Sequence, residues 1–146
     1  VKEVVHDTIF ITEYRDTCDS QFFKAIAEIE TGLVTINKAD TCYRYARVDG
    51  EQKRGIGHLG IYDIYVKGTG FPQILGYSHE DMYDLEKGAH TFWAMTGIFA
   101  HNYRRKHGVY PTYEQLARMH CGGPNGYNKT TTLRYLKKFV HVWNTI

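Results

Sequence analysis

The chain has 146 residues, a length that fits one domain better than two. Hydrophobic residues make up 42% and charged residues 23%, with 14 glycines and 3 prolines, and this composition excludes disordered and fibrous proteins. The 18 basic and 16 acidic residues give a formal net charge of +2, which is weak support for a nucleic-acid partner, and we expect none.

No stretch of the chain approaches the ~18–20 consecutive apolar residues that a membrane span requires. The first ten residues are also too charged for the core of a signal peptide. Residues 1–16 alternate loosely between apolar and polar side chains, which predicts an extended N-terminal arm before a single domain of residues 17–146.

The cysteines and histidines show no metal-binding pattern. Cys18, Cys42 and Cys121 have no C-x-x-C spacing, so the sequence predicts neither a zinc site nor a disulfide scaffold. The sequence leaves open that two of the three cysteines form a disulfide and the third is a free thiol. The eight histidines lack an established ligand spacing, and we expect no metal.

The first predicted helix covers about residues 20–31. Phe22, Ile26 and Ile29 recur there at helical spacing. Gly32 follows directly and is the residue type that most readily adopts the left-handed conformation found beyond helix ends. We therefore expect the helix to end at residue 31.

A β-hairpin is predicted next. Tyr43, Tyr45 and Arg47 alternate with their neighbours, and Asp49-Gly50 follows at once, the dipeptide typical of a tight hairpin turn. The region should form a small antiparallel β-wing.

Two helices should follow the wing. The first is short and runs from about Ile61 to the glycines of residues 67–70. Ser78 with Asp81, and Asp84 before Leu85, each supply a helix start for the second, a long helix of about 22 residues that ends at His107. The side chains expected on the apolar stripe of the long helix are Leu85, Phe92, Phe99 and Tyr103.

The C-terminal part carries two more helix signals. Thr112 with Gln115 forms a capping box before a helix at about 113–120, and the last helix should begin near Thr131. The side chains expected to face inward from this last helix are Leu133, Leu136, Val140 and Trp143. The elements together predict an α+β fold, dominated by helices, with a cleft beside the β-wing.

Glu30 is the carboxylate with the most informative position. It follows Ile26 by four residues, at the edge of the apolar stripe, and lies in the last turn of its helix. Burial and the negative end of the helix dipole both disfavour a charged carboxylate there. A carboxylic acid that keeps its proton near neutral pH is what a general acid for glycosidic bond cleavage requires. The alternative is a glutamate at a helix edge with its head in water.

Four segments carry a resemblance to a known superfamily: A-I-A-E-I-E-T-G at 25–32, G-H-L-G-I at 57–61, the segment from Tyr77 to Lys87, and L-A-R-M-H-C-G-G-P-N-G at 116–126. In this order they resemble the motifs of lysozyme-like glycosidases, the goose-type and bacteriophage-type lysozymes and the lytic transglycosylases. The resemblance implies a lysozyme-like fold, peptidoglycan as the partner, no cofactor, and Glu30 as the catalytic acid.

The resemblance also implies which residues line the cleft. The substrate-binding positions that we expect are Thr31, Tyr43, Tyr45, Gly60, Tyr62, His120, Cys121 and Tyr127. Three of them depart from the superfamily pattern, where a serine, a glutamine and an asparagine stand in place of Thr31, Gly60 and Cys121. A hydrolase also needs a second carboxylate, for which the candidates are Asp40, Asp49, Glu51 and Asp63.

Two functions follow as expectations. The first is a glycoside hydrolase or lytic transglycosylase that cleaves the β-1,4 bond of peptidoglycan and is secreted, periplasmic or virion-associated. The second is a catalytically degenerate lysozyme-like module with a binding or structural role in a virion or a larger assembly, because Gly60 and Cys121 lack the amides of the superfamily. Oligomeric state and compartment stay open.

Overall fold

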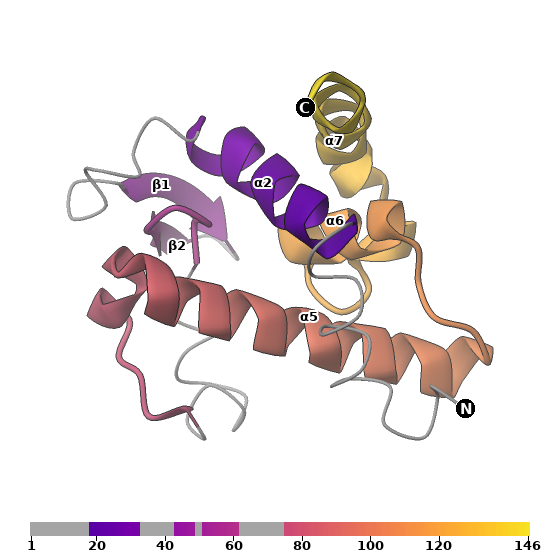
Figure 1. The fold of residues 1–146 in the computed structure, drawn as a ribbon, viewed down its shortest axis with the longest axis horizontal. Coiled ribbons are helices and arrows are strands. Elements are labelled where there is room, and N and C mark those ends of the chain that lie inside the picture. The colour runs from indigo at the N-terminus through magenta and orange to yellow at the C-terminus, as the bar shows by residue number, and fades with distance from the viewer. Residues whose placement is uncertain (1–17, 33–42, 49–50, 62–74) are drawn as a thin grey trace. The chain divides into compact units, whose positions relative to one another are not determined.

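The computed structural model describes residues 18–32, 43–48, 51–61 and 75–146 (Figure 1). For residues 18, 19, 43–48 and 51–54 the description covers the backbone alone. The chain divides into two compact units, one of residues 30–95 and one of residues 1–29 with 96–146, and each is treated by itself below. The predicted N-terminal arm lies outside the described residues.

Helix α2, Cys18–Thr31, confirms the first predicted helix. Phe22, Ala25 and Ile26 are fully buried, as their spacing on one face requires. The helix ends before Gly32, whose backbone is left-handed at φ 71°. This conformation costs glycine little and other residues more, so the chain leaves the helix at the position that the sequence marks.

The predicted hairpin is present. Strand β1, Tyr43–Val48, pairs antiparallel with strand β2, Glu51–Ile56, and the register joins Tyr43 to Ile56 and Val48 to Glu51. The short helix predicted from Ile61 is not confirmed at its first residue, because Ile61 forms an antiparallel bridge with Ile56. The rest of that predicted helix lies outside the described residues.

Helix α5, Leu85–His107, is the predicted long helix and has 23 residues. The Asp84 carboxylate accepts a hydrogen bond from the backbone N–H of Lys87 at 2.9 Å and so caps its first turn. Phe92 and Phe99 are buried as predicted, whereas Leu85 is 41% exposed, so that part of the prediction is wrong. Leu85 lies in the first turn, ahead of the buried stretch of the helix.

A short 3-10 helix, η3 at Glu80–Tyr83, leads into α5. Asp81 accepts a hydrogen bond from the backbone N–H of Ser78 at 2.8 Å and forms a 3.3 Å ion pair with Lys87. The backbone hydrogen bond from Ser78, with help from Lys87, lowers the pKa of the Asp81 carboxyl. The charged form of Asp81 thus stabilises the entry to α5.

Helix α6, Tyr113–Gly122, begins with the predicted capping box, in which the Gln115 backbone N–H donates to Thr112 Oγ1 and the Thr112 N–H donates to Gln115 Oε1. It runs two residues further than predicted. Two 3-10 turns, η4 at Gly126–Asn128 and η5 at Thr130–Thr132, connect it to the last helix.

Helix α7, Leu133–Thr145, buries a different face from the predicted one. Tyr135 and Phe139 are buried, whereas Leu133 and Val140 are 49% and 38% exposed, so the predicted inward positions of these two are wrong. The aromatic side chains decide the rotation of the helix, since each ring buries more apolar surface than an aliphatic side chain.

The aromatic rings around α7 form the core of the unit that contains residues 96–146. The Phe22 ring lies 5.0 Å from Tyr113 and 5.8 Å from Phe139, and Phe139 lies 5.5 Å from Trp143, measured between ring centroids. Rings at these separations attract one another beyond the effect of their burial. Residues from α2, α6 and α7 therefore share one cluster.

The described fold is helix-dominated, with one two-stranded antiparallel sheet among its described residues. None of its described helices combines the length and the apolar character that crossing a membrane would take.

Candidate active site at the end of α2

The segment Gly57–Gly60 forms a tight turn directly after β2. The backbone N–H of Gly60 donates to the Gly57 carbonyl at 3.2 Å, and Ile56 and Ile61 exchange two backbone hydrogen bonds of 3.0 Å beneath it. Gly57 and Gly60 have φ values of 79° and 62°, in the left-handed region that favours glycine. The G-H-L-G-I motif is thus a closed turn whose shape depends on both glycines.

Close backbone contacts fix this turn on two sides. A Cβ atom added to Gly57 would overlap the Met82 carbonyl group of η3. One added to Gly55, on β2, would lie 2.9 Å from the Gly60 carbonyl oxygen. Only a hydrogen atom fits at either position without a shift of the backbone. The backbone of the turn therefore packs directly against the backbone of η3.

His79 adds a side-chain bond to the same segment. Its Nε2 lies 2.7 Å from the Ile61 carbonyl oxygen, and because a carbonyl can only accept, the hydrogen is on Nε2. This bond ties the segment before η3 to the end of the turn.

The end of α2 lies against the other side of the turn. Thr31 Oγ1 donates to the His58 carbonyl at 3.1 Å. A Cβ atom added to Gly60 would lie 2.7 Å from Oε2 of Glu30, which places the carboxylate directly beside the Gly60 backbone. Two segments separated by more than twenty residues thus meet at one carboxylate.

Glu30 itself is half-buried, whereas the sequence led us to expect a buried residue at the foot of a cleft. Its position in the last turn of α2, at the edge of the buried face, accounts for the difference, because an edge residue is only partly covered by the core. A half-buried carboxyl group can reach both a protein neighbour and a bound substrate.

The side chain of His58 was not among the predicted site residues. It is 3% exposed, and neither ring nitrogen has a hydrogen-bond partner among the residues that the structure describes. A buried polar group without a partner destabilises the folded state by about 1–3 kcal/mol. Nothing in the sequence indicated that His58 is buried, since His58 stands between a glycine and a leucine in a turn and belongs to no helical or strand pattern.

Several predicted site residues cannot be compared with the structure. Those outside the described residues are Asp40, Asp49, Tyr62 and Asp63, and those with a described backbone alone are Tyr43, Tyr45 and Glu51. Tyr43 and Tyr45 lie two residues apart on β1 and therefore share one face of the hairpin. Their roles, and that of a second carboxylate, stay predictions.

Three further predicted residues belong to the other unit. Cys121 is exposed at the end of α6, and the centroid of the His120 ring lies 6.4 Å from that of the Tyr135 ring. The Tyr127 hydroxyl lies 2.9 Å from Nε2 of His107, at the C-terminal end of α5. Thr31 and Gly60 lie next to Glu30 in the structure. The positions of Cys121, His120 and Tyr127 relative to Glu30 are not determined.

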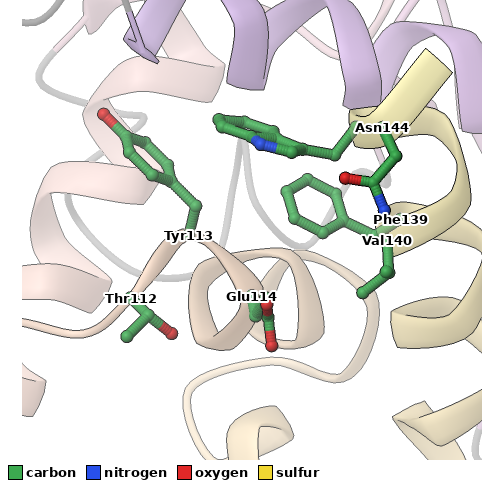
Figure 2. Close-up of a pocket in the computed structure, with 7 residues that line it drawn as sticks. Thr112, Tyr113, Glu114, Phe139, Val140 and Asn144 are labelled. Atoms are coloured by element: carbon green, nitrogen blue, oxygen red, sulfur yellow. The ribbon is translucent and has the colours of Figure 1, made fainter. Parts of the chain in front are cut away.

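An aromatic pocket of about 250 Å³ lies at the start of α6 beside α7 (Figure 2). Tyr113 and Trp143 stack at 5.5 Å between ring centroids, and Glu114 and Asn144 supply polar groups. None of the predicted site residues lines it. The pocket is smaller than the ~300–1,000 Å³ typical of small-molecule sites, and we assign no ligand to it.

Comparisons with known proteins leave the site to be interpreted from its own chemistry: no protein-family model, curated protein or solved structure matches the chain. Within the described ranges, no group of three or more histidine, cysteine, aspartate or glutamate residues could hold a metal ion. Among the predicted site residues that the structure describes at the turn, Glu30 is the one that carries a carboxyl group.

The Gly57 contact gives a test of the turn. Gly57→Ala should destabilise the protein by about 1–2 kcal/mol for the left-handed backbone and by ~1–3 kcal/mol more for the overlap with Met82. Gly76→Ala is the matched control, because Gly76 also has a positive φ of 72° but open space around it. Chemical denaturation measures the free energy of unfolding of both variants. Equal losses of stability in Gly57→Ala and Gly76→Ala would contradict the close packing of Gly57 on Met82.

The Thr31 bond gives a second test. Thr31→Val keeps the shape of the side chain but removes the donor to the His58 carbonyl, so stability should fall by about 1 kcal/mol. Thr31→Ser keeps the hydroxyl, so its stability should fall less. If denaturation showed the serine variant to be the weaker of the two, packing of the methyl group rather than the hydrogen bond would hold α2 on the turn.

Proposed function

We propose that the protein is a lysozyme-like glycosidase that cleaves the β-1,4 bond of peptidoglycan, with Glu30 as the general acid. The observation that carries the proposal is the contact between Glu30-Thr31 and the turn Gly57–Gly60. These are two of the four segments on which the superfamily resemblance was based, from sequence alone. Their meeting at a half-buried carboxylate supports the assignment, because unrelated matches would have no reason to be neighbours.

The chemistry needs a proton at the bond that breaks. The Glu30 carboxyl donates it to the glycosidic oxygen as the C–O bond lengthens, and positive charge develops on the sugar ring. The carboxylate that remains lies beside the charged ring and stabilises it. A hydrolase then adds water with the help of a second carboxylate, whereas a transglycosylase closes the ring with the sugar's own hydroxyl.

The turn supports this role by holding Glu30 in place. The Thr31 hydrogen bond fixes the last turn of α2, and the backbone of Gly60 blocks one side of the carboxylate. A position fixed in this way brings donor and leaving oxygen together without a further entropy cost.

A degenerate binding module is the second candidate, and Gly60 favours it. In the superfamily a glutamine stands at this position, whereas Gly60 has no side-chain amide that could hydrogen-bond sugar or water. Such a module would bind glycan without cleaving it. The two candidates therefore differ in a single measurable step.

The test is Glu30→Gln. Glutamine keeps the volume and shape but cannot donate a proton to the leaving oxygen, so cleavage of purified peptidoglycan should fall by ~10²–10⁴-fold while circular dichroism stays unchanged. Glu28→Gln is the matched control, because Glu28 is a half-buried glutamate on the same helix, two residues earlier. It should retain wild-type cleavage.

Two results count against the assignment. Wild-type cleavage by Glu30→Gln would show that another group is the acid. Equal binding of glycan by wild type and mutant, with cleavage by neither, would instead support the binding module.

A further inference from the structure

Charge is distributed unevenly along this chain. Residues 96–146 contain eight lysines and arginines and one acidic residue, Glu114, a formal charge of +7. The preceding 95 residues contain ten basic and 15 acidic residues, a charge of −5. The net charge of +2 therefore conceals a strongly basic C-terminal part, and such an asymmetry is typical of proteins that meet a polyanion.

Three of these basic residues lie together on α7. Arg134, Lys137 and Lys138 are all exposed and, at 100° per residue, fall within an arc of about 100° on the helix surface. The buried residues Tyr135 and Phe139 lie on the opposite side. We call Arg134, Lys137 and Lys138 the cationic stripe of α7.

Ordinary helix stabilisation does not explain the cationic stripe. The basic cluster of α5, residues 104–107, lies in the last turn, where the helix dipole favours positive charge. The last turn of α7 has no basic residue, and Arg134 lies in its first turn, where the dipole disfavours one. Arg134 and Lys138 are also four residues apart, a spacing at which like charges repel.

Acidic partners do not explain the stripe either. Helix α7 has no aspartate or glutamate, and across the described residues none of the three basic side chains has an ion-pair partner. The stripe therefore keeps its charge available for a partner outside the chain.

We propose that the cationic stripe of α7 binds an anionic polymer of the cell wall, a flexible chain of phosphodiester-linked polyols that accompanies the glycan. This inference rests on the proposed function, which brings the protein to the wall. Binding to the polymer would hold the protein near its substrate and so raise the local concentration of glycan.

The form of the stripe favours such a chain over a DNA duplex. Its three charges span only about 6 Å along the helix axis, and no amide or aromatic side chain stands between them to contact bases. A thin flexible chain can follow so short a stripe. A long stiff duplex would bring many phosphates near a protein whose other 95 residues carry a charge of −5.

The test measures binding to synthetic poly(glycerol phosphate) over a series of salt concentrations. The stripe variant is Arg134→Gln/Lys137→Gln/Lys138→Gln. Its affinity should fall at least about tenfold, and the slope of log affinity against log salt should fall by about 2–3, since each lost phosphate contact removes ~0.7–0.9. Cleavage of purified glycan without the polymer should not change.

The control variant Lys24→Gln/Arg105→Gln/Lys106→Gln removes the same charge from exposed residues of α2 and α5. It should lose at most about threefold in affinity. An equal loss in both variants would overturn the proposal, because net charge alone would then explain binding. Tighter binding to duplex DNA, or to phosphatidylglycerol vesicles, at equal phosphate concentration would also overturn it.

Cleavage separates this proposal from the proposed function. If wild type binds the polymer through the stripe but cleaves no glycan, the glycosidase assignment fails and the stripe is still supported. If wild type cleaves glycan but the stripe variant binds the polymer as well as wild type does, the stripe proposal fails alone.

Discussion

The close backbone packing of the turn Gly57–Gly60 is the constraint on which the candidate site depends. The turn contacts the end of α2 through the His58 carbonyl and the Gly60 backbone, and it contacts η3 through Gly57. A side chain at Gly57 or Gly60 would have to displace the Met82 backbone or the Glu30 carboxylate. The position of the Glu30 carboxylate beside the turn thus depends on the absence of Cβ atoms at Gly57 and Gly60.

Local signals predicted several elements of both units well. The Gly32 stop, the Asp-Gly hairpin and the Thr112 capping box each depend on a few neighbouring residues, and the structure has all three elements. Rotation of a helix about its axis depends instead on what packs against it. Leu133 and Val140 were expected to face the core from α7. The buried face is instead the one that carries Phe139, which packs against the Phe22 ring of α2.

The same distinction explains which parts of the site could be predicted. The sequence could nominate Glu30, Thr31 and Gly60 because the motifs that carry the resemblance specify residue types at these positions. The carbonyls of His58, Ile61 and Met82 could not be found, since every residue has a carbonyl and only the fold decides which ones are used.

The mass of the products released from purified peptidoglycan tests the central claim most directly. If Glu30 protonates the glycosidic oxygen, wild-type protein should release disaccharide fragments that carry either a free reducing end, the mark of a hydrolase, or a 1,6-anhydro end, the mark of a transglycosylase. Glycan that stays intact after prolonged incubation with folded protein would contradict the account.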